Sequence, residues 1–257
     1  MELVVPARFC GPPESGNGGW TSGHLARQVE TTPELPAVTV RLRTPPPLDR
    51  PMTVRPSAAD GDGTGDGAGA GAGGAQGVDL VDGEHLVAQA WPDRGPGPEG
   101  VPAPVPFEVA TAAGSHFEGL DDHPFPTCFS CGTGRTPGDG LCLRPGRVDT
   151  GDTYACAWVP GADVDEETVW AALDCPGGWA SGIAGRPMVL GTMTARIDGL
   201  PTPGAPHVVM AWQRGEQGRK HLSGTALYTA DGRLLAQAEA TWIAVDPTTV
   251  RPAGATR

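Results

Sequence analysis

Two segments that lie far apart in this sequence carry residue types that could act together on one substrate. Residues 15–30 form an expected helix that begins near the pair Gly18 and Gly19 and has no acid inside it. Residues 164–180 form an expected helix with Asp174 inside it and no glycine pair at its start. Free N–H groups at a helix start stabilise a developing negative charge, and a positioned carboxylate can accept a proton. We therefore expect one composite site, with backbone donors from the first helix and Asp174 from the second.

Asp174 is the main candidate for catalysis. Leu173 and Cys175 flank it, and a helix wrapped by a curled sheet buries apolar residues on most of its surface. Loss of hydration raises the pKa of a carboxyl group and makes it a better base near neutral pH. The structural alternative is an acid that accepts a hydrogen bond from a backbone N–H or pairs with an arginine.

The glycine pair and the residue before it supply the other half of the expected site. Gly18 and Gly19 could let a carbonyl group approach the N–H groups of the helix start, although a loop that needs glycine dihedral angles would also explain them. Asn17 could donate a hydrogen bond from its side-chain amide. Asn17 and Ser22 are also of types that commonly cap helices, and capping is the role that we expect.

Strand-like sequences follow each expected helix. In the first half, residues 37–44 alternate apolar and polar side chains, and residues 51–56 and 83–92 follow. The second half has strand-like runs at 141–148, 152–160, 188–199, 207–217, 220–232 and 233–245. The sequence Ala-Asp-Gly at 230–232 is typical of a hairpin turn. This order of elements predicts long antiparallel pairing around a central helix in each half.

Composition shifts divide the chain into two halves. We expect an N-terminal half at 1–92, which contains a disordered Gly/Ala-rich insertion at 58–77. A segment rich in proline and glycine follows at 93–125 and is expected to be a linker. Such sequence loses much conformational entropy on ordering and buries little apolar surface. The C-terminal half is expected at 126–246, with a flexible tail at 247–257.

Charge and hydropathy exclude several classes of protein. The chain has 257 residues and a formal net charge of −12, which repels a phosphate backbone and argues against nucleic-acid binding. No run of apolar residues is long enough to span a membrane, so no membrane partner is expected. The first residues lack the pattern of a signal peptide, and the six cysteines are then expected to be reduced thiols in the cytoplasm.

The cysteines raise the question of a metal. Cys128 and Cys131 form one Cys-x-x-Cys pair, and a structural zinc site needs four ligands. The residues that could complete it are Cys142, His123 and His116. Their spacing matches no common zinc module, so the sequence predicts a packing or turn-forming pair, no metal and no cofactor. Cys175 has no histidine close in sequence and is expected to be a small buried hydrophobe.

Three segments of the second half resemble PaaI-like thioesterases of the hotdog superfamily. PTCFSCGTGRTPGDGLCLRPGRV at 126–148 is similar to the opening of that family, which begins with Cys-x-x-Cys-Gly, Gly-Leu and a first strand. GTALYTADGRLLAQAEATWI at 224–243 resembles its closing hairpin. WAALDCPGGWA at 170–180 lies where the central helix of the family carries its catalytic acid. Residues 9–92 resemble the family less closely, through a helix and three or four strands.

The resemblance implies an α+β double hotdog, in which two antiparallel sheets each wrap around a long central helix and join as a pseudo-dimer. In the family, His-Gly-Gly starts the helix and an acid follows about two turns later. Here Asn17 stands where the histidine would be, and the first half lacks the acid. The second half has Glu166 and Glu167 in place of the glycine pair. Since family sites lie between facing subunits, a fused pair can keep one site from two incomplete ones.

The implied function is that of an enzyme, a thioesterase that hydrolyses an acyl-CoA or an acyl-carrier-protein thioester. Asp174 would be the base or nucleophile, and the Gly19 N–H would hold the oxyanion. Trp20 and Trp179 could wall an acyl pocket, and Arg219 and Lys220 could bind phosphates, although core filling and a solvated hairpin are the respective alternatives. A non-catalytic protein that binds acyl-CoA or an acyl carrier is the alternative function, and a homodimer is a possible further assembly.

Overall fold

The structure is a computed structural model that describes residues 1–57, 76–97, 100–148 and 152–246. Most of the predicted insertion at 58–77 and all of the predicted tail at 247–257 lie outside the described residues. Within the four described ranges, no helix is both long enough and apolar enough to cross a membrane.

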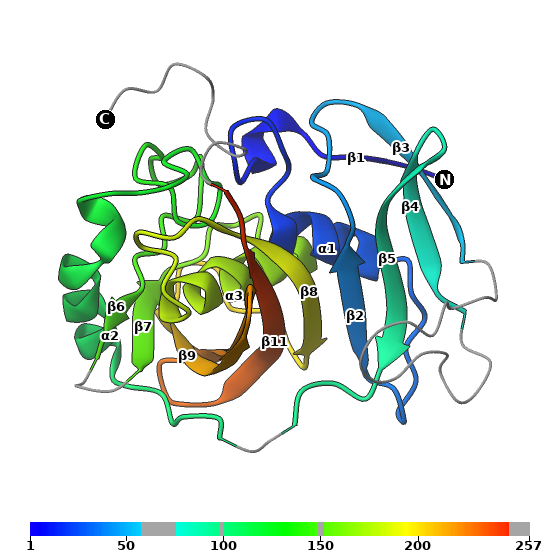
Figure 1. Cartoon of the computed structure of the whole chain (residues 1–257). Helices are drawn as coiled ribbons and strands as arrows, with labels where there is room; N and C mark the ends of the chain where they lie inside the picture. Colours follow the sequence, from blue (N-terminus) through cyan, green and yellow to red (C-terminus); the bar gives the residue numbers. More distant parts are fainter. Residues whose placement is uncertain (58–75, 98–99, 149–151, 247–257) are drawn as a thin grey trace.

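Antiparallel strands from the first half of the chain form one end of a large sheet (Figure 1). They are β1 (Glu2–Val4), β2 (Ala37–Leu42), β3 (Pro51–Pro56), β4 (Val78–Asp82) and β5 (His85–Asp93). Their order across the sheet is β1-β3-β4-β5-β2, so β2 is the innermost. The sequence predicted β2, β3 and β5, while β1 and β4 are short and were not predicted.

Strands from the second half form the other end of the same sheet. They are β6 (Gly146–Arg147), β7 (Thr153–Trp158), β8 (Met188–Ile197), β9 (His207–Gln217), β10 (Lys220–Thr229) and β11 (Leu234–Ala244). Their order is β8-β11-β10-β9-β7-β6. The β10–β11 hairpin closes where it was predicted, and its turn has Gly232 at a φ of 87°. Of the strand expected at 141–148, only β6 forms.

The two sets of strands meet at one seam, where β2 pairs with β8 from Val38↔Ala195 to Arg41↔Thr192. The sequence predicted two sheets, but this pairing joins them into a single 11-stranded sheet. An unpaired strand edge exposes N–H and C=O groups, and joining two edges satisfies both. At the seam the hydroxyl groups of Thr39 and Thr194 also form a hydrogen bond of 2.7 Å.

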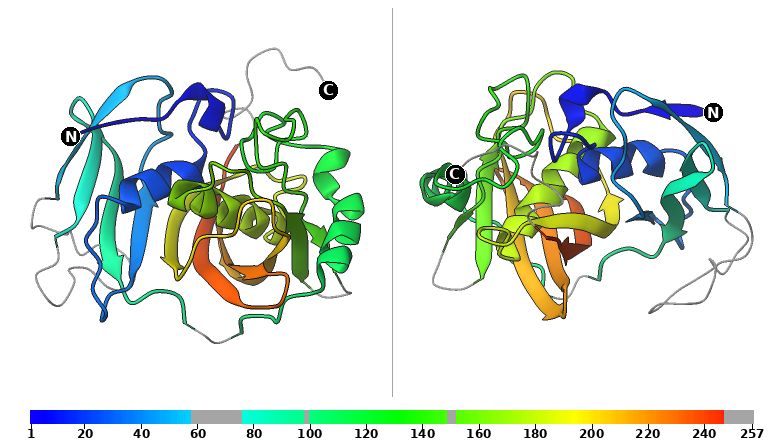
Figure 2. Two further views of the ribbon diagram at one scale, coloured as in Figure 1. Left: turned by 180° about the vertical axis from the view of Figure 1, so that it is seen from behind. Right: turned by 45° about the horizontal axis from the view of Figure 1, so that its top comes forward.

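Two helices lie in the concave side of the sheet, as the two views of Figure 2 show. They are α1 (Gly18–Ala26) and α3 (Glu166–Ala180). Asn17 caps α1, because its side chain accepts a hydrogen bond from Trp20 N, and Asp165 caps α3 by accepting one from Thr168 N. Asn17 has the capping role expected from the sequence, whereas Ser22, the other candidate, lies inside α1.

Glycines bring α1 and α3 into close contact. A Cβ placed on Gly19 would lie 2.4 Å from Asp174 Cβ, and one on Gly23 would lie 2.8 Å from Trp170 Cβ. Any larger residue at these two positions on one face of α1 would therefore push the helices apart. The absence of a side chain at Gly19 allows this approach of the helices. It places the start of α1 against the middle of α3.

Part of the segment predicted as a linker is structured. It contains the helix α2 (Phe107–Ala113) and the short 3-10 helices η2 (Gly114–His116) and η3 (Glu118–Leu120). Outside this segment, one further 3-10 helix among the described residues, η1 (Ala7–Phe9), precedes α1. Figure 1 shows α2 beside β6 and β7, and Ala110 belongs to a small apolar cluster with Ala155 of β7. Between the end of β5 and the start of α2, the described residues form no helix.

Candidate active site

A cavity of about 470 Å³ lies between the start of α1 and the middle of α3. Its polar wall contains Asn17, Gly18 and Asp174. Its apolar wall contains Leu42, Trp179, Ile183, Met188, Leu190 and Trp242. A volume of this size with a few polar groups on an apolar wall is typical of a small-molecule site. The cavity therefore brings together the two half-sites that the sequence predicted separately.

Asp174 is buried in the wall of this cavity, with 2% of its surface exposed. Its Oδ2 accepts hydrogen bonds from Gly19 N at 2.9 Å and from Asn17 Nδ2 at 3.3 Å. Its Oδ1 is buried and has no hydrogen-bond partner among the described residues. Burial raises the pKa of Asp174 to about 7, and the hydrogen bonds from Gly19 and Asn17 only partly oppose this rise.

Asn17 connects three parts of the site. Its Oδ1 accepts from Trp20 N at 2.8 Å, and its Nδ2 lies 3.3 Å from both Asp174 Oδ2 and Ser130 Oγ. Ser130 Oγ in turn donates to Ala171 O on α3 at 2.8 Å. The same side chain therefore caps α1, as expected, and its amide group donates to the Asp174 carboxylate, a role that the sequence did not predict.

The two glycines of α1 have different surroundings. Gly18 lines the cavity, whereas the Gly19 N–H points to Asp174 and donates to it. The first N–H groups of a helix have no acceptor within the helix. Of these, Gly19 N donates to Asp174 and Trp20 N donates to the capping side chain of Asn17. Gly18, the first residue of the helix, lies at the cavity surface.

The two tryptophans proposed for the acyl pocket are not equivalent. Trp179 lines the cavity, and its ring packs edge-on against Phe117 and His123. Trp20 is buried but does not line the cavity; its ring stacks on Phe9 with the centroids 4.1 Å apart and on His24 with the centroids 5.0 Å apart. Trp20 therefore has a core-filling position.

The two basic residues proposed for phosphate binding lie at the turn between β9 and β10. Arg219 and Lys220 are both exposed, and neither lines the cavity. Lys220 pairs across the sheet with Ile243, which does line the cavity, and Arg219 O accepts from Ala244 N at 2.9 Å. The two cations are thus next to the cavity rim rather than inside it.

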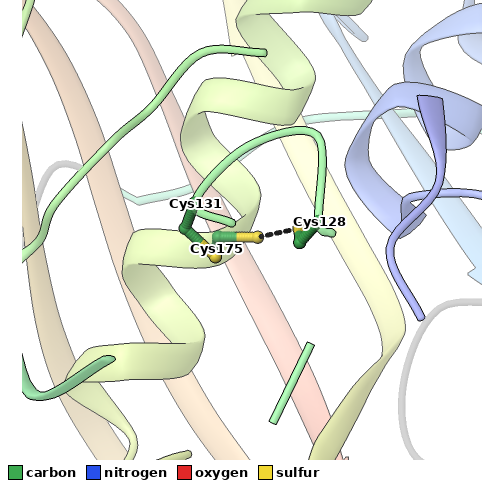
Figure 3. A group of neighbouring side chains, drawn as sticks. All are labelled: Cys128, Cys131 and Cys175. Atoms are coloured by element: carbon green, nitrogen blue, oxygen red, sulfur yellow. Dashed lines mark hydrogen bonds between the residues drawn. The ribbon is translucent and has the colours of Figure 1, made fainter. Parts of the chain in front are cut away.

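Three cysteines meet beside Asp174. Cys128 and Cys131 come from the loop before β6, Cys175 comes from α3, and their sulfur atoms all lie within 4.8 Å of one another (Figure 3). All three are buried, and all three line the cavity. The sequence did not predict this cluster, because Cys175 is 47 residues from Cys128 and the helix and loop meet only in the folded chain.

The three thiols shift the pKa values of one another. Hydrogen bonds from the thiols of Cys131 and Cys175 hold the pKa of Cys128 well below its ordinary value, against the effect of burial. The pKa of Cys131 is raised, chiefly by burial. That of Cys175 is raised because it donates to the other two sulfurs.

The two histidines, His116 and His123, and the cysteine considered from the sequence as further metal ligands are not part of the cluster. Both ring nitrogens of His123 are occupied: Nδ1 accepts from Phe125 N at 2.9 Å, and Nε2 lies 3.1 Å from Cys131 O. Cys142 is half-buried and belongs to no cluster of metal-binding groups in the part of the chain that the structure describes.

No protein-family model matches the chain, and no curated protein matches its sequence. Solved structures match it in three dimensions. A conserved protein of unknown function with a hot dog fold, from Alicyclobacillus acidocaldarius, is 13% identical, and the match covers 96% of this chain and 93% of that one at a TM-score of 0.56. This chain has a hotdog fold.

Other solved structures that match this chain in three dimensions have names that state an activity. A candidate thioesterase II from Thermobifida fusca is 13% identical, with 95% of this chain and 92% of that one covered and a TM-score of 0.61. An acyl-CoA thioesterase II from Mycobacterium marinum is 10% identical, with 91% and 93% covered and a TM-score of 0.52. Structural matches at such low identity establish the fold alone. The activity has to be argued from the site.

Proposed function

We propose that this hotdog chain is an enzyme that hydrolyses an acyl thioester, with Asp174 as the base that activates water or as the nucleophile. The observation that carries the proposal is the position of the Asp174 carboxylate. It is buried in the cavity wall, oriented by Gly19 N and Asn17 Nδ2, and has one oxygen without a partner. The names of several solved neighbours, thioesterase II and acyl-CoA thioesterase II, support the reaction class.

The surroundings of Asp174 favour chemistry over a structural ion pair. In the described part of the chain, no Lys, Arg or His forms a salt bridge with it. A carboxylate that is not neutralised by a cation stays available to take a proton from a water molecule in the cavity. The water would then attack the carbonyl carbon of the thioester, and the thiol would leave.

The developing oxyanion needs a donor that is free in the resting site. The sequence suggested the Gly19 N–H, but that group holds Asp174. We assign the role to Gly18, the first residue of α1, whose position in the cavity wall would let its N–H face the carbonyl oxygen. Gly19 then acts as a positioning residue for the carboxylate, together with Asn17.

The substrate class follows from the two ends of the cavity. Its apolar wall, which includes Trp179 and Leu190, suits an acyl group. Arg219 and Lys220, next to rim residue Ile243, suit the phosphates of CoA or of a carrier-protein arm. We propose that the chain is of the PaaI-like kind, which its segments at 126–148 and 224–243 resemble.

We also propose that the chain is a double hotdog, in which each half forms one unit. In support, α1 contacts β2 and β5 of the first half, α3 contacts β7 to β11 of the second, and the halves meet at the β2–β8 seam. The site takes Asn17 and Gly18 from the first half and Asp174 from the second. A site between two units explains why each half alone has an incomplete set of residues.

The test is a thiol-release assay on a panel of short, aromatic and long acyl-CoAs, with the enzyme far below the substrate concentration. Asp174→Asn should lower kcat by about 10²–10⁴-fold, the usual contribution of a general base. Asp163→Asn is the matched control, because its side chain is 81% exposed and lies outside the cavity.

The outcomes separate the two functions. Turnover by the wild type that is lost in Asp174→Asn but retained in Asp163→Asn supports hydrolysis at Asp174. Acyl-CoA binding by calorimetry without turnover of any substrate would establish the binding protein instead. Equal activity of wild type and Asp174→Asn would remove Asp174 from the reaction.

A further inference from the structure

The three clustered thiols have the spacing of metal ligands. Zinc bound by thiolates in a tetrahedron has Zn–S bonds of about 2.3 Å, which places the sulfurs roughly 3.8 Å apart. Here Cys128 Sγ and Cys175 Sγ are 3.5 Å apart, and all three sulfurs lie within 4.8 Å of one another. Figure 3 shows the three side chains close together, two from the loop and one from α3, with the Cys128–Cys175 contact dashed. Small shifts of the side chains would place all three on one ion.

A hydrogen-bond donor lies against two of these sulfurs. Asn17 Nδ2 lies 3.7 Å from Cys128 Sγ and 3.9 Å from Cys175 Sγ. Such donors delocalise the negative charge of metal-bound sulfur and are the usual second layer around a metal site.

The indole N–H of Trp179, which lines the same cavity, has no hydrogen-bond partner among the described residues. The Asn17 amide lies against two of the sulfurs and favours negative charge on them, because a neutral thiol is only a weak acceptor.

A disulfide explains the cluster less well. A disulfide joins two sulfurs, so any pairing among Cys128, Cys131 and Cys175 leaves one buried thiol unused. One divalent cation satisfies the three together, and zinc is a divalent ion that soft thiolate ligands bind well.

We propose that Cys128, Cys131 and Cys175 bind one zinc ion as thiolates. Binding leaves all three as thiolates, and the protons that they still carry are released to solvent. The fourth tetrahedral position stays open toward the cavity, which all three cysteines line. A site with three protein ligands and one open position differs from the closed four-ligand site for which the sequence offered no set of residues. The proposal stands independently of thioester hydrolysis.

The first measurement is the metal content of the purified full-length chain, expressed with zinc in the medium and gel-filtered before elemental analysis. We expect about one zinc per chain in the wild type. Cys128→Ser and Cys175→Ser should each lose it. Cys142→Ser is the matched control, since Cys142 follows the same loop but lies outside the cluster, and it should keep the metal.

A second measurement covers the case in which a cluster variant does not fold, which circular dichroism would reveal. Wild-type protein stripped with a chelator is titrated with Co²⁺, and tetrahedral thiolate ligation gives intense visible bands and a sulfur-to-cobalt charge-transfer band. These bands should saturate at one equivalent and disappear when Zn²⁺ is added. Cys142→Ser should give the same spectrum.

Three results would overturn the proposal. The first is a wild-type chain that carries no zinc and shows no cobalt bands on titration. The second is zinc that remains at full occupancy in folded Cys128→Ser and Cys175→Ser, which would place the ion elsewhere. The third is a Cys128–Cys175 disulfide found by mass spectrometry in the chain as purified under non-oxidising conditions.

Discussion

A single amide side chain, that of Asn17, holds the candidate site together at the residue scale. It caps α1 through Oδ1, and through Nδ2 it reaches Asp174 and Ser130. In the family that the sequence resembles, a histidine stands at this position. An amide can donate one hydrogen bond and accept another at the same time, which a capping residue beside a carboxylate has to do.

The two roles of Asn17 can be separated by substitution. Asn17→Ser retains a good capping oxygen but removes the amide donor, and Asn17→Ala removes both. We expect both variants to lose about 10–100-fold in turnover, because a hydrogen bond to a charged group contributes about 1.5–3 kcal/mol. We expect Asn17→Ala to unfold about 1 kcal/mol more easily than Asn17→Ser.

Thiol-release kinetics and urea unfolding of the two variants check this prediction. If Asn17→Ser kept wild-type turnover, the amide would have only the capping role. If the two variants were equally stable, the cap would contribute nothing measurable to α1.

At the scale of elements, the contact between α1 and α3 decides where Asp174 lies. The side-chain-free face of α1 at Gly19 and Gly23 lets the helices approach until backbone and Cβ atoms touch. That approach puts the Gly19 N–H at 2.9 Å from Asp174 Oδ2. The spacing of the helices therefore sets the geometry of the carboxylate.

Gly23→Ala tests this contact without altering a residue of the cavity. The new Cβ would lie 2.8 Å from Trp170 Cβ and 2.9 Å from Glu167 Cα, so the helices must separate. We expect a loss of about 1–3 kcal/mol in the free energy of unfolding, in spite of the better helix propensity of alanine.

Gly114→Ala is the control for Gly23→Ala, because Gly114 has a helical φ of −60° and its Cβ would meet Arg144 Cβ at 3.4 Å. It should leave the unfolding free energy unchanged or raise it. Urea unfolding of both variants gives the comparison, and a Gly23→Ala chain as stable as wild type would show that the helices tolerate a wider separation.

At the scale of the whole molecule, the halves of the chain meet through the β2–β8 seam and through the two helices. One buried acid adds an electrostatic link between the halves. Glu167 on α3 lies 2.7 Å from Arg27 Nη1 and 3.1 Å from His24 Nδ1, both at the end of α1. Burial alone would raise its pKa, but hydrogen bonds from His24 and Arg27 lower it from 4.5 to about 2.

This link predicts how stability depends on pH. Because the pKa of Glu167 is lower in the folded chain than in the unfolded chain, its contribution is complete above pH 4.5 and is lost as the pH falls toward 2. We expect Glu167→Gln to cost about 1–2 kcal/mol at pH 7, since Arg27 is half exposed and solvent screens the pair. Near pH 2 the variant and the wild type should have similar stability.

Urea unfolding at several pH values measures this difference, and Glu166→Gln is its control. Glu166 is a neighbouring acid on the exposed face of α3. Its replacement by glutamine removes the same charge but does not alter the contacts of Glu167 with Arg27 and His24. A Glu167→Gln deficit that stayed constant from pH 7 to pH 3 would contradict the ion-pair explanation.

Local sequence patterns determined much of the secondary structure. The capping residue Asn17, the strands β8 to β11 and the hairpin turn at Gly232 depend on neighbours within a few residues, and all were predicted. The burial of Asp174 also followed from its apolar helix. The strands β1 and β4 and the helix α2 were missed, because they are short and are fixed by their packing partners rather than by a local pattern.

The tertiary structure alone decided which groups meet at the site. Asp174 and Gly19 are 155 residues apart, and no spacing in the sequence shows that the Gly19 N–H binds the carboxylate instead of facing the cavity. The same holds for Cys175, which joins Cys128 and Cys131 only when α3 packs against the loop. The joining of β2 to β8 likewise turned two predicted sheets into one. Such contacts depend on how the chain closes on itself, whereas caps, turns and helical faces depend on adjacent residues.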